Sequence, residues 1–169
     1  MQSRFDPSHH HLVEQRYFDD FAVGEVFRAP SRTMTDAYFQ VFQAASADNH
    51  PLHYDRHYCQ RRGHRDLVAH GFQVLIQTCP GATILVHQID NAIVAFLEQS
   101  SRFLAPVYAG DTVYPTLTIS ALTPQRTTGV MELKATVHNQ HGCLVLDGEH
   151  KLLVRRRRPE MTPSPDSTM

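Results

Sequence analysis

The sequence predicts a single α+β domain, because its helical patterns fall in the first half of the chain and its strand patterns fall mostly in the second. Residues 35–88 hold three helical segments, and residues 91–156 are rich in β-branched residues divided by turn signals. No internal repeat marks a second domain. We therefore expect a folded domain over residues 16–157, a disordered leader over 1–15 and a disordered tail over 158–169.

The composition is that of a soluble globular protein. Of 169 residues, 41% are hydrophobic and 20% are charged, which is enough apolar content for one core. The net charge of -1 gives no reason to expect nucleic acid or an anionic membrane as a partner. No apolar run reaches the roughly 18 residues that span a bilayer, and no signal-peptide core is evident, so we expect a cytoplasmic protein.

Cysteine and histidine usage predicts neither disulfides nor a metal site. Cys59, Cys79 and Cys143 form no C-x-x-C pair and are expected to be free thiols. Only His9 to His11 cluster among the 12 histidines, and they lie in the polar leader. Because no set of potential ligands has metal-site spacing, we predict no metal.

Capping signals divide the first part of the chain. A short strand is expected over residues 26–32. Thr35 is a suitable N-cap for a first helix that ends near Asp48. Asp55 can cap a second short helix that closes at Gly63.

Gly71 opens the longest helical pattern of the chain. Its apolar residues cover most sides of the helix, which predicts a buried helix. These residues are Phe72, Val74, Leu75, Ile76, Cys79, Ala82, Leu85 and Val86. Pro80-Gly81 interrupts the pattern, so we expect a kink or an early end there, with a second short turn beyond it.

The remainder of the chain is predicted to be β-structure. The expected strands span residues 91–107, 112–123, 128–138 and 144–156. We expect a bend at Ser100-Ser101, a turn at residues 109–111, and a hairpin turn at residues 139–142 between the last two strands.

One stretch carries a candidate for chemistry, Ala47-Asp48-Asn49-His50-Pro51-Leu52-His53. Pro51 breaks any helix and favours an extended His50, so the chain can turn and bring His53 back beside Asp48. Two groups of different proton affinity facing one molecule suit general acid/base catalysis. The alternative is that Asp48 caps a turn and His53 is an ordinary loop histidine.

The order Asp-x-x-Pro-Leu-His, followed by Leu67-Val68-Ala69-His70-Gly71-Phe72, resembles the MaoC-like, or R-specific enoyl-CoA hydratase 2, family. The similarity extends from about Tyr17 to Arg156. Aligned on the proline, the catalytic aspartate and histidine of the family fall on Asp48 and His53. Two positions depart from the family pattern: Ala47 stands where glycine is usual, and His50 stands where asparagine is usual.

The resemblance implies a hotdog fold, in which a curved antiparallel sheet wraps around a central helix that starts at Gly71. It implies reversible hydration of a trans-2-enoyl thioester to the R-3-hydroxyacyl thioester, with no cofactor. The substrate would be an acyl-CoA, or an acyl-ACP, and the assembly a homodimer or a multiple of dimers. Asp48 and His53 would share the proton transfers, and the N–H of Gly71 would stabilise the enolate oxygen.

Further substrate contacts are expected around this centre. We expect His50, Phe72 and Cys79 near the substrate, with Cys79 close to the place where family members often carry a serine. His70 is expected there too, with a structural hydrogen bond as its main role.

Two other functions fit the same fold. A hotdog thioesterase would hydrolyse the C–S bond with a carboxylate-activated water, but it has no carbon to protonate and so no need for the histidine. A non-catalytic acyl-CoA-binding protein is supported by the departures at Ala47, His50 and Cys79.

The sequence contains two groups of arginines, and each group has two possible roles. Arg56, Arg61 and Arg62 could meet the phosphates of coenzyme A or form a solvated helix face. The run of four arginines at residues 155–158 could bind phosphate or RNA, although a solvated run that protects the sheet edge is more usual at a chain end.

Overall fold

A computed structural model describes residues 6–7 and 10–157 of the chain. Its framework is an antiparallel sheet of order β1-β4-β5-β6-β3, with a short β2 that also pairs with β4. The strands are β1 (Val26–Arg28), β2 (Arg32–Thr33), β3 (Ile93–Phe103), β4 (Thr112–Pro124), β5 (Thr128–Asn139) and β6 (Leu144–Arg155). The single α+β domain that the sequence predicts is confirmed.

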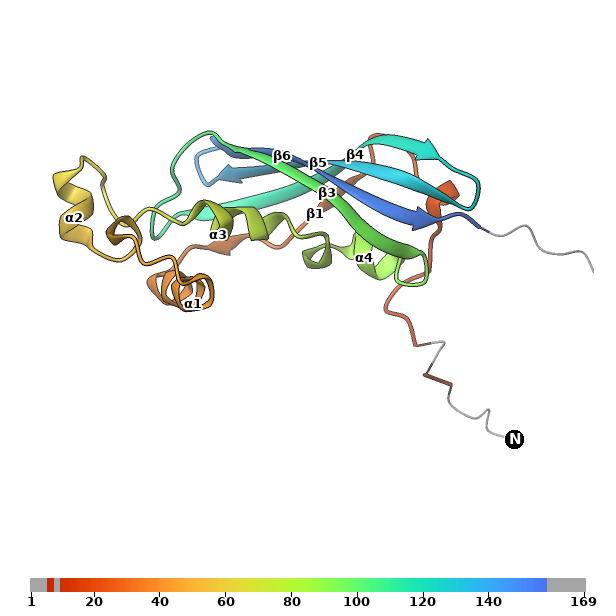
Figure 1. The fold of residues 1–169 in the computed structure, drawn as a ribbon, viewed down its shortest axis with the longest axis horizontal. Coiled ribbons are helices and arrows are strands. Elements are labelled where there is room, and N and C mark those ends of the chain that lie inside the picture. Colours follow the sequence, from red (N-terminus) through yellow and green to blue (C-terminus); the bar gives the residue numbers. More distant parts are fainter. Residues whose placement is uncertain (1–5, 8–9, 158–169) are drawn as a thin grey trace, which may run out of the picture.

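Helical segments lie along one face of the sheet and at one of its ends (Figure 1). The central run consists of α3 (Gly71–Leu75), η4 (Ile76–Thr78), η5 (Pro80–Ala82) and α4 (Ile84–Gln88). The end of the sheet carries α1 (Asp36–Ser46), η3 (Pro51–His53) and α2 (Arg56–Arg61), while η2 (Phe18–Asp20) packs at the other end. One core cluster joins α4 to the sheet around Leu85 and Leu133, and a second joins α1 and α3 around Phe39 and Val74.

The central helix is shorter and less buried than the sequence predicts. The expected break at Pro80 is present, because Cys79 before it adopts an extended conformation (φ -56°, ψ 127°). The α-helix has already tightened to 3₁₀ at Ile76, however, and Phe72 and Ile76 face solvent with 70% and 41% of their surface exposed. One side of the central run is therefore uncovered in this chain.

Most boundaries follow the expected signals. Thr35 and Asp55 cap α1 and α2 by accepting backbone N–H bonds. The strand expected over residues 26–32 divides into β1 and β2, with Pro30, which has no N–H to donate, in the gap. The bend expected at Ser100-Ser101 is wrong, since pairing with β6 is regular from Glu98 to Phe103 and the irregularities fall earlier, between residues 93 and 98. Bulges there supply the curvature instead.

The chain ends are held by ion pairs and hydrogen bonds where they are described. Arg156 and Arg157 pair with Asp19 and Asp20 at 2.7 and 2.6 Å, so these two arginines of the basic run fasten the end of β6 to η2. In the leader expected over residues 1–15, Gln15 donates to the His87 carbonyl at 2.8 Å, whereas residues 1–5 and 8–9 lie outside the described part, as does the tail expected over 158–169. No helix in the described part is long and apolar enough to cross a membrane.

Candidate active site

A left-handed residue reverses the chain at the end of α1 and presents Asp48. Ala47 has φ 57° and donates its N–H to the Gln43 carbonyl, which ends the helix. The Asp48 N–H then donates to Ser46 Oγ at 3.2 Å, and Asp48 Oδ1 accepts the His50 N–H at 3.4 Å. The carboxylate is thus fixed at its base while 53% of the side chain stays exposed to solvent.

His50 and Pro51 build the turn that returns the chain to Asp48. His50 is extended and caps η3, its ring Nδ1 accepting the Leu52 N–H at 3.3 Å. An asparagine side-chain oxygen can accept the same bond. The departure from the family pattern at this position therefore keeps the capping function.

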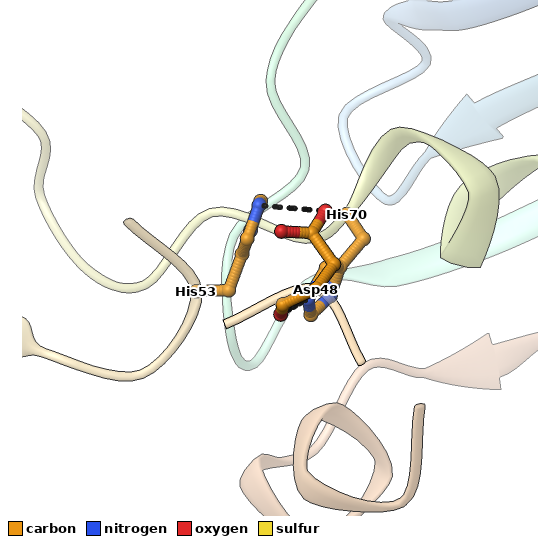
Figure 2. Close-up of side chains that lie close together, drawn as sticks. All are labelled: Asp48, His53 and His70. Carbon is orange, nitrogen blue, oxygen red and sulfur yellow. Dashed lines mark hydrogen bonds and ion pairs between the residues drawn. The ribbon is translucent and has the colours of Figure 1, made fainter. Parts of the chain in front are cut away.

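His53 faces Asp48 with one defined nitrogen. Its Nδ1 lies 2.6 Å from the Val68 carbonyl, which can only accept, so Nδ1 carries the hydrogen. In a neutral ring Nε2 then holds the lone pair, and it lies 3.9 Å from Asp48 Oδ2 (Figure 2). Burial lowers the pKa of His53 below its usual value and outweighs the opposing effects of the Val68 carbonyl and of Asp48. The imidazole is therefore neutral at neutral pH.

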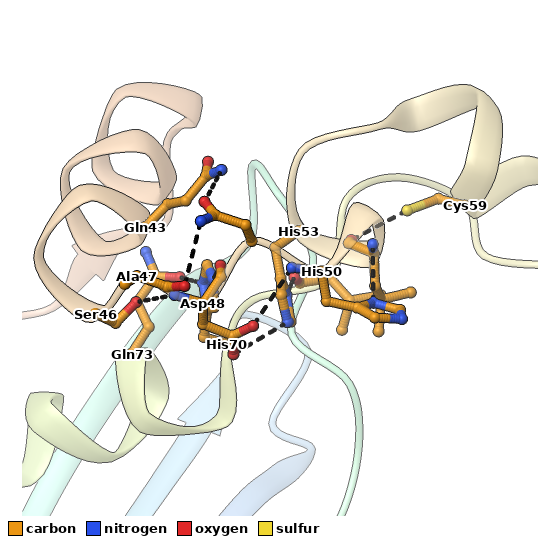
Figure 3. Close-up of polar contacts among 12 residues, drawn as sticks. Gln43, Ser46, Ala47, Asp48, His50, His53, Cys59, His70 and Gln73 are labelled. Carbon is orange, nitrogen blue, oxygen red and sulfur yellow. Dashed lines mark hydrogen bonds and ion pairs between the residues drawn. The ribbon is translucent and has the colours of Figure 1, made fainter.

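His70 links the two groups from behind. Its ring stacks on His53 with centroids 3.7 Å apart, and its Nε2–H donates to the Asp48 backbone carbonyl at 3.1 Å. Its Nδ1 lies 3.4 Å from Gln73 Oε1, and the residue is 2% exposed. These contacts fit the structural hydrogen bond that the sequence predicts for His70, and Figure 3 shows the network from α1 to α3.

An apolar cavity of about 420 Å³ opens beside His53. Its wall includes Gly71 at the start of α3, whose N–H has no acceptor within the helix. The other lining residues are mostly hydrophobic: Leu52, Val68, Ala69, Val74, Phe103, Leu104, Ala105, Pro106, Val107 and Val145. A Cβ on residue 71 would lie only 3.1 Å from the Phe103 ring, so a larger residue here would push that ring aside by a few tenths of an ångström.

The structure brings some of the expected site residues together and separates others. Asp48, His53 and His70 place their polar atoms within 4.8 Å of one another, and Gly71 shares a cavity with His53. Phe72 and Cys79 do not line that cavity, and both side chains are exposed. Both lie on the exposed side of the central run.

The sequence reasoning missed the groups that orient His53. The Val68 carbonyl that accepts from His53 belongs to the backbone, so a side-chain motif cannot predict it. Phe103, whose ring lies against Gly71, is not among the predicted site residues, because this contact arises from tertiary packing.

Asp48, His53 and His70 also bring together three potential metal ligands, one carboxylate and two imidazoles. Their present geometry does not suit one, because stacked imidazoles point their in-plane lone pairs past each other rather than at one ion. In addition, His70 Nε2–H is already bonded to the Asp48 carbonyl. A metal would require both rings to turn.

A family model for the MaoC-like domain matches residues 20–140. The chain belongs to the MaoC-like domain family. This MaoC-like chain is 27% identical to the (R)-specific enoyl-CoA hydratase of Rhodospirillum rubrum over 141 residues, which cover 83% of the chain and 93% of the relative.

Solved structures agree with the family. The monoamine oxidase regulatory protein from Archaeoglobus fulgius superposes with a TM-score of 0.80 at 27% identity, covering 88% of the MaoC-like chain and all of that protein. A Mycobacterium tuberculosis protein with a double hotdog fold gives a TM-score of 0.72 at 26% identity, covering 89% of the chain and 47% of that protein. The family and the hotdog fold expected from the motifs are confirmed.

Proposed function

We propose that this protein catalyses the reversible addition of water to a trans-2-enoyl thioester, giving the (3R)-3-hydroxyacyl thioester. The main support is the pair Asp48 Oδ2 and His53 Nε2, 3.9 Å apart, of which His53 lines an apolar cavity. The similarity to an (R)-specific enoyl-CoA hydratase supports the reaction class and its stereochemistry. The substrate is an acyl-CoA or acyl-ACP thioester.

The spacing of the pair suits one shared water. Both facing atoms are acceptors when Asp48 is ionised and His53 is neutral, so they repel unless a donor lies between them. A water oxygen about 2.8 Å from each would make an angle of about 90° between them, close to the H–O–H angle of water. That water would direct its remaining lone pairs away from the pair, toward substrate carbon C3.

The proton transfers balance within the pair. As the water oxygen bonds to C3, one group accepts a water proton, and the electrons of the double bond move toward the thioester oxygen. The protonated group of the pair then delivers a proton to C2, which returns both side chains to their starting states. Such proton transfer typically contributes about 10² to 10⁴-fold to the rate.

The Gly71 N–H would stabilise the charge on the thioester oxygen. It lines the same cavity as His53 and has no intrahelical partner. Because α3 has only 5 residues, the individual N–H donor matters more here than a long helix dipole. A well-placed oxyanion donor is worth about 10² to 10³-fold. The apolar lining beyond it would hold the acyl chain.

Assembly as a homodimer or a multiple of dimers belongs to the same proposal. β3 ends the order of strands in the sheet, so its outer edge has no partner strand among the described residues. Large hydrophobic side chains are exposed on and beside it: Val94, Phe96, Leu97, Phe103 and Leu104. Pairing of two β3 edges would cover them and satisfy their backbone groups.

A product assay tests the function. Purified protein is incubated with a panel of enoyl-CoA esters, and loss of the conjugated absorbance is followed together with free thiol. We expect absorbance loss without thiol release, and an R product on chiral analysis. Thiol release in step with absorbance loss would instead identify a thioesterase.

A further inference from the structure

A second cavity, of about 450 Å³, shares Leu52 with the apolar one. Its lining is basic and aromatic, and consists of His50, Leu52, Tyr58, Arg62 and His64. Leu52 is the one lining residue that the two cavities share. His53 lines the apolar cavity, and His50, three residues before it, lines the basic one.

The arginines around α2 differ in what they bind. Arg56 is held between Asp36 at 2.7 Å and Asp66 at 2.9 Å, so it serves the packing of α1 and α2. Because two carboxylates already neutralise the charge of Arg56 and occupy its N–H groups, Arg56 is poorly suited to bind an anionic ligand.

Arg62 is placed differently. Its guanidinium lies 5.1 Å from the centroid of the Tyr58 ring, and no carboxylate pairs with it in the described part of the chain. The Tyr58 ring in turn meets the His50 ring edge to face at 5.7 Å. An uncompensated guanidinium held on an aromatic wall presents its N–H fork to an anion, and phosphate is the anion that this fork fits best.

We propose that this second cavity binds the phosphate at the end of the pantetheine arm that carries the acyl group, with Arg62 as the main contact. The proposal rests on the hydratase function, since it assumes that the thioester sits at Asp48 and His53. The phosphate is common to coenzyme A and to the prosthetic group of an acyl carrier protein, so the chemistry of the site fits either carrier.

The reach of the arm agrees with this placement. The ring centres of His53 and His50 are 6.2 Å apart, those of His50 and Tyr58 are 5.7 Å apart, and the Arg62 guanidinium lies 5.1 Å from the centre of the Tyr58 ring. The pantetheine arm has about as many main-chain bonds as four to five amino acid residues, which gives a reach of roughly 15 to 17 Å. These pairwise distances set an upper limit on the distance from His53 to Arg62, and the reach of the arm is close to that limit.

Arg62→Gln tests the proposal, with Arg61→Gln as its matched control. Arg61 is the neighbouring exposed arginine and does not line the cavity. Steady-state kinetics are measured on three enoyl thioesters: of coenzyme A, of 4′-phosphopantetheine, and of pantetheine, which lacks the phosphate. We expect Arg62→Gln to raise KM about tenfold on the first two, with kcat within about twofold of wild type, and to leave KM on the pantetheine thioester unchanged. Arg61→Gln should change none of these.

The arms of the experiment separate the possible failures. If Arg62→Gln raises KM equally on all three thioesters, the phosphate assignment is wrong. If it raises KM only on the coenzyme A thioester, the assignment is also wrong, because Arg62 would then contact the nucleotide part of coenzyme A. Enoyl-ACP, assayed beside enoyl-CoA in the wild type, shows which carrier supplies the phosphate.

A binding measurement keeps the test independent of catalysis. If the wild-type protein hydrates no thioester, the proposed function fails. The cavity is then tested by calorimetry with coenzyme A alone, where about tenfold weaker binding by Arg62→Gln than by Arg61→Gln supports the site and equal binding refutes it. Thermal unfolding of both variants shows whether a loss comes from misfolding.

Discussion

At the scale of single residues, Ala47 determines where Asp48 points. It is the one non-glycine residue with positive φ in the described part of the chain, at 57°. A Cβ in this left-handed conformation destabilises the folded state by roughly 1 to 2 kcal/mol. A glycine would remove that strain, but it would also stabilise the unfolded chain by about 0.4 to 1 kcal/mol because glycine has more conformational freedom there. We predict that Ala47→Gly raises the free energy of unfolding by about 0.5 to 1 kcal/mol, measured by denaturant unfolding.

Ala44→Gly is the matched control for this change. Ala44 is exposed within α1, where the backbone is right-handed. There the same substitution should lower the free energy of unfolding by about 1 kcal/mol. Equal effects at the two positions would contradict the role given to the left-handed turn.

His53 should set the acid limb of the activity profile. Burial depresses its pKa below the ordinary 6.5, and only the neutral ring can accept a proton from water. We predict that kcat/KM is flat around pH 7 and falls with a midpoint below 6.5 as pH decreases. An acid limb centred above 6.5 would contradict this.

The same shift affects stability. The pKa of His53 is lower in the folded state than in the unfolded state, so the unfolded state takes up a proton first as pH falls. The free energy of unfolding therefore keeps the full contribution of His53 above pH 6.5 and loses it as pH falls from there through the folded pKa. His150 adds to this trend, since burial lowers its pKa as well.

The sequence predicted the reacting residues better than the residues that hold them in position. Asp48 and His53 could be paired because Pro51 demands a bend between them. The stacking of His70 on His53 could not be foreseen, because it depends on how α3 approaches η3 in space. Phe72 is expected near the substrate, whereas its side chain is 70% exposed and does not line the cavity beside His53.

At the scale of elements, the central helix shows why boundaries were missed. Pro80 predicts a break in the helix, but the helix changes to a 3₁₀ turn earlier, at Ile76. In this turn the Thr78 hydroxyl donates to the Leu75 carbonyl at 2.7 Å and lies 2.9 Å from Nε2 of the buried His150. Side-chain bonds to the backbone of the preceding turn compete with regular helix. The partner on β6 that fixes this turn is 72 residues away in sequence, beyond any local pattern.

The pairing of β3 with β6 depends on Gly148. A Cβ there would lie 2.5 Å from the Ser100 carbonyl oxygen, which is backbone and cannot move without shifting β3. We predict that Gly148→Ala lowers the free energy of unfolding by about 2 kcal/mol or more. Gly81→Ala, where no atom lies within 4 Å of the new Cβ, should change it by less than about 0.5 kcal/mol. Denaturant unfolding of both variants checks the difference.

At the scale of the whole molecule, the open edge of β3 predicts assembly. The exposed apolar side chains on it are better explained by a second copy of the chain than by solvent. We predict that sedimentation at micromolar concentration shows a dimer or a multiple of it. Leu97→Lys, which places a charge on the exposed edge strand, should shift the equilibrium toward monomer.

Val41→Lys is the control for this prediction. Val41 is an exposed apolar residue on α1, at the end of the sheet, and its replacement should leave the assembly unchanged. A wild-type protein that sediments only as a 19.2 kDa monomer would contradict the dimer.

The central claim is that Asp48 and His53 act as one unit on a single water during hydration. The direct measurement is turnover of an enoyl-CoA by Asp48→Asn, His53→Gln and the double variant, with Asp90→Asn and His57→Gln as exposed controls. We predict that each single change costs at least about 10²-fold in kcat, that the double variant is no worse than the poorer single variant within a few-fold, and that the controls match wild type. Single losses below about tenfold, or a double loss equal to the product of the two, would contradict the shared water.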